Sequence, residues 1–206
     1  MAVAATAGLL LTACGGESEQ KDDKIAGADK GHKATESPKT GPSGTANRPT
    51  ITFPKDVRNV FEGWETGEPT KDAVLADVSR TVNAVDDAIL RGDVDSPAVS
   101  YYRKGEAAAS ASKWIQAWLD EDLTFTGITR YYAPKIQMSG KTSASVVYCA
   151  DESKAYDKNR KTRKVDKSPS GENPYVLYNT RLEKSDKGVW QTTKVLSKRG
   201  DKSCAS

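Results

Sequence analysis

The stretch KDAVLADVSRTVNAVDDAIL, residues 71–90, decides the fold. Its large apolar residues recur at steps of three and four, at Leu75, Val78, Val82, Val85 and Ile89. That spacing places them on one face of an α-helix. Thr70 is a candidate N-cap and Gly92 a candidate C-terminal stop, so the pattern predicts a helix over residues 71–91.

Two shorter helices are expected after this one. Ser96 followed by Pro97 is typical of a helix start, because proline fits the first turn. Gly105 separates that short helix from a third, which runs to about Asp122 with Ala107 and Trp114 on its apolar face. By contrast, residues 53–64 have an apolar spacing that leaves a short helix and an irregular segment equally open.

The sequence changes character after residue 123. Four segments rich in Thr, Val and Tyr read as strands: LTFTGITRYY, SASVVYCADE, YVLYNTRLEK and VWQTTKVLSK. SDKG at 185–188 is a hairpin turn between the last two. GKT at 140–142 is also a turn, because a phosphate loop would need glycine where Lys135 stands. The order predicts an α+β fold, a curved antiparallel sheet of about four to six strands packed against three N-terminal helices.

The N-terminus predicts export and a lipid anchor. Residues 1–11 form an uncharged apolar run that is shorter than the ~20 residues of a spanning helix and fits a secretory signal. Leu11-Thr12-Ala13-Cys14 resembles the lipobox of bacterial lipoproteins. The resemblance implies that Cys14 carries acyl chains such as palmitate, which would hold the protein on the extracytoplasmic face of the cell membrane.

Residues 15–50 are expected to be a disordered tether between this signal, residues 1–14, and a single domain over residues 51–206. From residue 17 to residue 50 the chain has one large aliphatic residue, Ile25, with six acidic and six basic residues. Such a composition buries too little apolar surface to fold. The net charge of +3 is too mild to indicate nucleic-acid binding, and none is predicted.

The three cysteines divide into one anchor and one pair. An exported chain can form disulfides, and two cysteines remain once Cys14 is lipidated. Cys149 lies in a predicted strand and Cys204 just after the last one. We therefore predict a Cys149–Cys204 disulfide.

No catalytic residue, metal site or cofactor is predicted. His32, the only histidine, lies in the expected tether. Triads and zinc sites that depend on histidine are thus excluded from the domain. Asp93 and Asp95 share a loop, but the glycine and glutamate of a calcium loop are absent.

Two groups of side chains are candidates for binding. Aromatic residues that could line a ligand cleft, or equally form ordinary core, are Tyr102, Trp114, Trp118, Tyr131, Tyr148 and Tyr178. The run KAYDKNRKTRKVDK, residues 154–167, holds seven basic and two acidic residues and is expected to project as a hairpin or loop. It is either a solvated loop or a patch for anionic surfaces, with Lys158, Arg160, Lys161, Arg163 and Lys164.

Residues 70–204 resemble a nuclear-transport-factor-2-like domain, which is cystatin-like and cone-shaped. The resemblance rests on the order of the elements and on AAASASKWIQAW (107–118) and GVWQTTKVLS (188–197). YYAPKIQ (131–137) and ASVVYCADESKAY (144–156), together with the lipobox, also resemble uncharacterised exported lipoproteins of high-GC Gram-positive bacteria. The superfamily includes polyketide-cyclase-like enzymes, which commonly use an Asp/His pair, and non-catalytic binding domains.

Three functional hypotheses follow. The first is a lipid-anchored, non-catalytic envelope protein whose domain binds a small apolar ligand or an envelope protein through the aromatic cleft. The second is a polyketide-cyclase-like enzyme that uses carboxylates and tyrosines in the cone, with Asp151 and Tyr148 as nominees. The third is a structural spacer that docks on anionic envelope polymers through residues 154–167.

Overall fold

The computed structural model describes residues 47–168 and 173–205. The lipobox with Cys14, and the expected tether up to residue 46, lie outside the described residues. The described elements are β1 (Val57–Phe61), α1 (Pro69–Arg91), α2 (Pro97–Tyr102), α3 (Gly105–Asp120), β2 (Leu123–Ser139), β3 (Ser143–Asn159), β4 (Tyr175–Lys184) and β5 (Trp190–Arg199). The α+β class, the three helices and the sheet predicted from the sequence are confirmed.

The long helix α1 ends where the sequence predicts but begins earlier. Gly92 has a φ of 76°, and its N–H donates to the carbonyls of Ala88 and Ile89. A left-handed glycine that closes the last turn is a common helix stop. Thr70 is not the N-cap, because the helix starts at Pro69 and Glu68 occupies the cap position. Proline is well suited to the first helical position, where its missing N–H costs no hydrogen bond.

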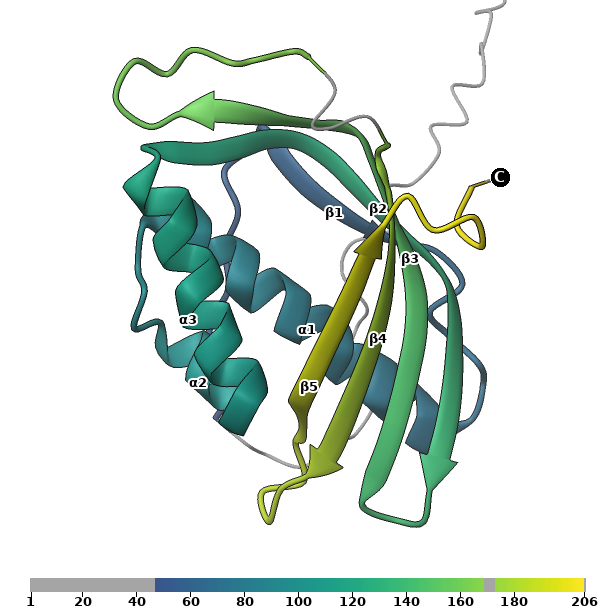
Figure 1. The fold of residues 1–206 in the computed structure, drawn as a ribbon. Helices are drawn as coiled ribbons and strands as arrows, with labels where there is room; N and C mark the ends of the chain where they lie inside the picture. The colour runs from purple at the N-terminus through teal and green to yellow at the C-terminus, as the bar shows by residue number, and fades with distance from the viewer. Residues whose placement is uncertain (1–46, 169–172, 206) are drawn as a thin grey trace, which may run out of the picture. The chain divides into compact units, whose positions relative to one another are not determined.

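The five strands form one sheet in the order β1-β2-β3-β4-β5. Strands β2 to β5 are an antiparallel meander, whereas β1 pairs parallel to β2, with Val57 opposite Gly127. Residues 57–61 are thus an edge strand, neither the helix nor the irregular segment that the apolar spacing left open. The sheet curves around α1 (Figure 1). In the same view α2 and α3 lie on the side opposite β3 and β4.

Irregularities in β2 provide the bend. The register with β3 shifts between Ile128 and Arg130 and again between Tyr132 and Lys135. Bulges of this kind kink a strand and increase its twist. Gly127 lies at the first bend with a φ of 100°, and a Cβ there would lie 2.1 Å from the carbonyl oxygen of Lys154. Only glycine fits this close approach between β2 and β3.

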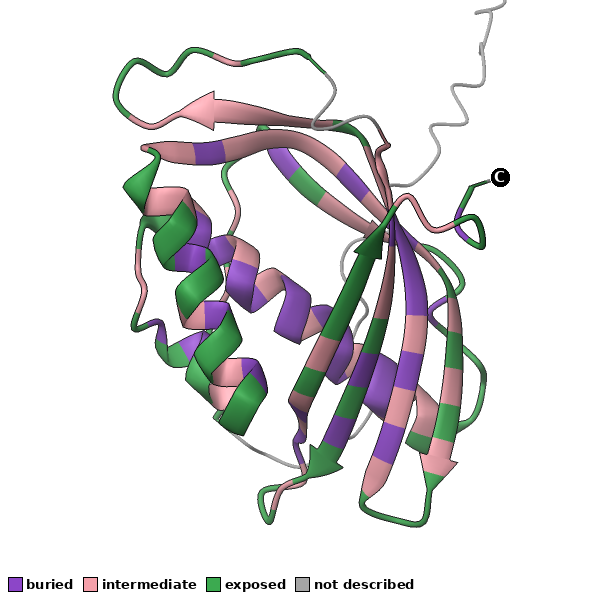
Figure 2. Ribbon diagram, viewed as in Figure 1, coloured by how far each residue is buried: buried purple, intermediate pink, exposed green. Residues whose placement is uncertain are grey.

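The core has two parts, one packed on the first half of α1 and one on its second half. Val74, Leu75, Val78 and Val82 pack against the sheet, in a cluster that includes Tyr148 and Trp190. Further along the helix, Val85 and Ile89 pack with residues of α2 and α3. Figure 2 shows the resulting band of buried residues along α1 and the alternation of buried and exposed positions along the strands. No helix among the described residues is long and apolar enough to cross a membrane.

Both predicted hairpin turns are confirmed. Gly140, with a φ of 78°, lies between β2 and β3. Gly188 has the same φ, and its N–H donates to the carbonyl of Ser185 at 2.8 Å between β4 and β5. The hairpin that was one of the two expectations for residues 154–167 is present, because Lys158 bridges Val165 and the N–H of Asp166 donates to the carbonyl of Asp157 at 2.8 Å. Residues 154–159 continue β3 and pair with the start of β2, and the turn begins only at Arg160.

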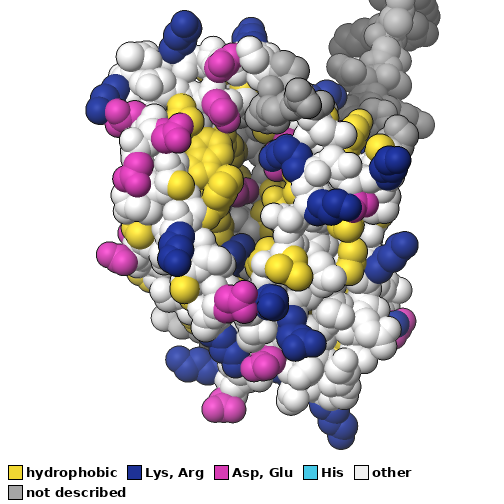
Figure 3. Space-filling model, in the orientation of Figure 1, with side chains coloured by type: hydrophobic (Ala, Val, Ile, Leu, Met, Phe, Trp, Pro, Cys, Tyr) yellow, Lys and Arg dark blue, Asp and Glu magenta, His cyan; other side chains and the backbone are white. Residues whose placement is uncertain are grey.

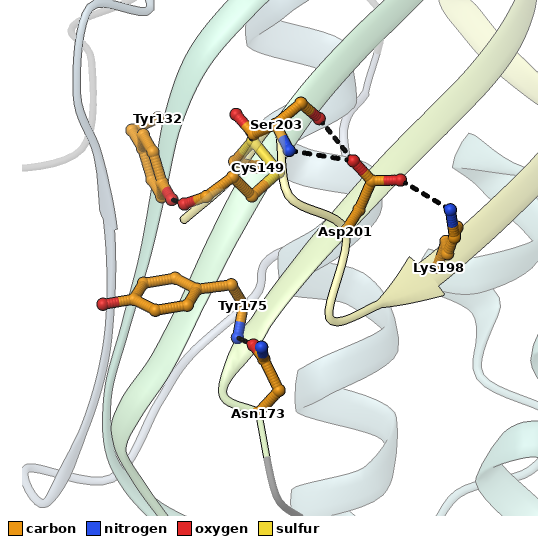
Figure 4. Close-up of a disulfide and its surroundings, with 8 residues drawn as sticks. Tyr132, Cys149, Asn173, Tyr175, Lys198, Asp201 and Ser203 are labelled. Carbon is orange, nitrogen blue, oxygen red and sulfur yellow. Dashed lines mark hydrogen bonds and ion pairs between the residues drawn. A yellow bond between two sulfur atoms is a disulfide. The ribbon is translucent and has the colours of Figure 1, made fainter. Parts of the chain in front are cut away.

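The predicted disulfide is confirmed. Cys149 on β3 and Cys204 are bonded with their Cα atoms 5.5 Å apart (Figure 4). The segment that carries Cys204 is further held by the hydroxyl of Tyr132, which donates to the Cys204 carbonyl. Asp201 accepts hydrogen bonds from the N–H and hydroxyl of Ser203 and pairs with Lys198 at 3.0 Å. The crosslink thereby ties the end of the chain to the centre of the sheet.

Candidate ligand-binding site

A hollow opens between α3 and the sheet. Figure 3 shows it on the face seen in Figure 1, with hydrophobic side chains along the wall on the α3 side. The polar groups described below come from the elements that enclose this interior.

Three tyrosines on adjacent strands form an aromatic wall. Tyr148 and Tyr178 are direct cross-strand partners on β3 and β4, and their rings stack with centroids 5.1 Å apart. Tyr131 on β2 meets Tyr148 edge to face at 6.1 Å. Burial raises the pKa of all three hydroxyls. They therefore stay neutral and act as hydrogen-bond donors and acceptors at physiological pH.

Asp86 on α1 is the carboxyl whose pKa best suits a proton acceptor. Burial raises its pKa to about 7, although the Asn59 side chain stabilises the charged form by donating to Oδ2 at 2.6 Å. The negative charge of Glu152 raises the pKa further, and the positive charge of Arg103 opposes it. A carboxyl with a pKa near neutrality can exchange a proton at physiological pH.

Arg103, between α2 and α3, is a buried guanidinium with spare donors. Burial lowers its pKa, which Tyr148, Tyr178 and Asp86 partly restore. One long hydrogen bond of 3.5 Å joins its Nη1 to the Ala107 carbonyl. Its buried Nε has no hydrogen-bond partner among the described residues. Buried polar groups are nearly always hydrogen-bonded, so an unsatisfied one needs a reason.

Together these groups suit a small molecule with an apolar body and a polar end. The tyrosine wall supplies contact area, Arg103 supplies donors for an oxygen acceptor, and Asp86 supplies a proton acceptor or donor. Within the described ranges no group of three or more His, Cys, Asp or Glu residues could hold a metal ion.

The structure brings together only some of the predicted aromatic residues. Tyr131, Tyr148 and Tyr178 lie side by side. Trp114 and Trp118 meet edge to face at 6.0 Å on α3, with Trp114 56% exposed. Tyr102 is fully buried, contacts Arg48 through its hydroxyl, and packs edge to face with Tyr101 in a different core cluster from Tyr131 and Tyr148. Arg48, which the sequence placed in the tether, is thus in contact with the folded domain.

The five basic residues predicted as an anionic-surface patch do not all face outward. Lys158 pairs with Asp56 at 2.7 Å and keeps only 12% of its side chain exposed. Arg160 donates to the carbonyls of Leu123 and Leu90 at 2.8 and 3.3 Å. Lys161 pairs with Asp122, while Arg163 and Lys164 are exposed on the turn. The patch stays a prediction.

Sequence reasoning nominated Asp151 and missed Asp86 and Arg103. Burial acts to raise the pKa of Asp151, but its bonds with Ser153 and Arg130 outweigh burial and lower it. Asp151 is therefore an ion-pair partner rather than a base. A signal for Asp86 existed, because it stands four residues after Val82, at the edge of the apolar face of α1. Nothing in the local sequence distinguishes Arg103.

The chain matches no protein-family model and no curated protein sequence. Among solved structures it is similar to a ketosteroid isomerase-like protein from Erwinia carotovora atroseptica, at 18% identity over 61% of this chain and 95% of that one, with a TM-score of 0.41. It is also similar to an NTF-2 like protein of unknown function from Shewanella oneidensis, at 18% identity over 59% and 95% of the two chains, with a TM-score of 0.38.

A third similar structure is the intermembrane space region of the chloroplast protein ARC6. The identity is 12% over 60% of this chain and 92% of that one, with a TM-score of 0.41. These values carry no activity from any of the three proteins to this chain.

Proposed function

We propose that the domain binds a small molecule in the hollow and that the molecule places an oxygen acceptor on Arg103. The observation that carries this proposal is the buried guanidinium, with an Nε that has no hydrogen-bond partner among the described residues. Leaving a buried donor unsatisfied costs about 1–3 kcal/mol, and more for a charged group. A bound carbonyl, carboxylate or hydroxyl oxygen would remove that cost.

The surroundings of Arg103 support an amphiphilic ligand rather than a bare ion. Tyr148 and Tyr178 present stacked rings next to the guanidinium charge. Aromatic rings with polar tips contribute both apolar area and hydrogen bonds in ligand sites. The ligand would therefore have a flat or branched apolar part against the tyrosines and one polar end at Arg103.

Native mass spectrometry of the protein purified from its native host tests the proposal. We expect a small molecule to remain bound to the natural protein and to be lost from the Arg103→Met variant, which keeps the apolar stem of the side chain. Arg181→Met, at an exposed position on β4, is the matched control. A molecule retained equally by all three proteins, or absent from all of them, would contradict the proposed site.

A second candidate function is acid–base chemistry on the bound molecule, and the raised pKa of Asp86 favours it. A carboxyl with a pKa of about 7 beside a cationic donor is suited to removing a proton next to a carbonyl group. Asp86→Asn should then abolish turnover of the recovered molecule while leaving its binding within a few fold. If the natural protein binds the molecule but does not turn it over, the acid–base function is contradicted and the non-catalytic binding function stands.

The cellular setting is a separate proposal. Lipidation of Cys14 would anchor the protein on the extracytoplasmic face of the cell membrane, a placement that rests on the lipobox sequence. Metabolic labelling with palmitate and detergent phase partition test it in the native host. The natural protein should incorporate label and enter the detergent phase, and Cys14→Ser should do neither. Equal partition of the two proteins would overturn the anchor.

A further inference from the structure

A second pocket lies on a different side of α1 from the tyrosine wall. It has a volume of about 370 Å³ and is formed by residues 48–53, β1, α1 and the end of α2. That volume is within the range of about 300–1,000 Å³ typical of small-molecule sites. The amide of Asn59 separates it from Asp86, because its Nδ2 donates to both Asn83 and Asp86. No ligand is assigned to this pocket by the function proposed above.

The charged side chains that line this pocket are all positive. Three arginines line it, Arg48, Arg58 and Arg80, and its described lining contains no acidic side chain. The carboxylate of Asp77 lies behind the wall, where it is 1% exposed and pairs with Arg48 at 2.5 Å and Arg80 at 3.1 Å. One buried negative charge thus balances one of three positive charges.

Asp77 also fixes the shape of the pocket. It accepts the backbone N–H of Trp190 at 2.9 Å, so the carboxylate is anchored from β5 as well as from two arginines. Arg48 further contacts the hydroxyl of Tyr102 at 3.4 Å. Guanidinium groups held in place before binding lose little conformational freedom when a ligand arrives. Arg58, by contrast, is exposed and makes no ion pair with any described residue.

The remaining wall is apolar. It consists of Pro49, Ile51, Phe53 and Val57. Val57 is buried and the other three keep partial exposure. An inorganic anion alone would leave this surface without contacts, whereas an anion joined to a short hydrocarbon or aryl group would cover it.

We propose that this pocket binds a small amphiphilic anion, with a carboxylate or phosphate monoester at the arginines and an apolar body on the wall formed by residues 49–57. Arginine suits both head groups, because its planar fork donates two parallel hydrogen bonds to carboxylate or phosphate oxygens. Arg58 closes on the head group from the rim, while Arg48 and Arg80 supply the fixed positive field. The site is independent of the ligand at Arg103.

Titration of the full-length protein with four probes, followed by backbone amide NMR, tests the proposal. Benzoate and phenyl phosphate carry both parts of the proposed ligand, inorganic phosphate lacks the apolar body, and benzyl alcohol lacks the charge. We expect saturable shifts at Val57, Asn59 and Asn83 with the first two probes, weakening as salt is added. The stronger of the two identifies the preferred head group. Shifts confined to Tyr148 and Tyr178 would report the other site and would overturn this one.

Variants at Arg58 make the test specific. Arg58→Ala should weaken binding of the preferred probe about tenfold, and Arg58→Lys should restore only part of it, because lysine keeps the charge without the fork. Arg181→Ala, exposed on another strand, is the matched control and should bind normally. Saturable binding unaffected by Arg58→Ala, equal binding of benzyl alcohol or inorganic phosphate, or no binding of any probe would each overturn the proposal.

Discussion

The Nδ2 of Asn59 donates a hydrogen bond of 2.6 Å to Oδ2 of Asp86, and this contact joins β1 to the interior of the domain. Because the bond stabilises the ionised carboxylate, it holds the pKa of Asp86 lower than burial alone would. Asn59→Leu should therefore raise the pKa of Asp86 above its present value of about 7. A carboxyl-carbon NMR titration measures the change, and an unaltered midpoint would contradict it.

Asp86 also predicts how stability varies with pH. Its folded pKa of about 7 lies above the unfolded value near 4, so the folded state holds the proton more tightly. The stabilisation that protonated Asp86 contributes is fully present below pH ~4 and is lost as the pH rises to about 7. The loss amounts to about 2–4 kcal/mol in the free energy of unfolding. Asp86→Asn removes this titration. The free energy of unfolding of the variant, measured relative to that of the natural protein, should therefore be higher at pH 8 than at pH 4. Chemical denaturation at the two pH values checks the sign.

Asp77 is expected to be the most costly carboxylate to remove. Asp77→Ala leaves Arg48, Arg80 and the N–H of Trp190 without their shared acceptor. Removing one partner of a buried ion pair costs about 3–5 kcal/mol. Urea denaturation should show a loss of that size, against a change within about 0.5 kcal/mol for the exposed control Glu65→Ala. Equal effects of the two substitutions would mean that the Asp77 cluster does not hold α1 to β5.

The sequence was most informative where one physical rule acts alone. The apolar spacing of α1 and the glycines at 92, 140 and 188 are local signals, and each places an element or a turn correctly. The two cysteines that remain after Cys14 is set aside were likewise predicted correctly as a disulfide. These features need no knowledge of the rest of the chain.

Features that depend on distant partners were missed. Residues 57–61 become a strand because β2 offers a free edge, and their own spacing does not favour one. Asp86 and Arg103 gain their character from burial beside residues of other elements. Lys158 was assigned to a basic patch on the expected hairpin or loop, yet it pairs with Asp56, 102 residues away in sequence. Sequence pattern alone does not encode such pairings.

The disulfide should stabilise the domain measurably. Cys149 and Cys204 close a loop with a sequence separation of 55 residues, for which the chain-entropy model gives about 4 kcal/mol. The double variant Cys149→Ala/Cys204→Ala should lose about 2–4 kcal/mol in chemical denaturation. A reducing agent should destabilise the natural protein by a similar amount and leave the double variant unchanged. A reductant effect on the variant would point to a cause other than this crosslink.

Gly127 should be the least replaceable glycine among those with a positive φ. A methyl group there would meet the Lys154 carbonyl at 2.1 Å, while Gly67, with a φ of 78°, has nothing within 4 Å of the same position. Both alanine variants carry backbone strain of about 1 kcal/mol, but only Gly127→Ala also forces β2 and β3 apart. We expect a loss above about 2 kcal/mol for Gly127→Ala and about 1 kcal/mol for Gly67→Ala. Comparable losses in thermal denaturation would show that the bend in β2 tolerates a side chain, and the curvature of the sheet would then need another cause.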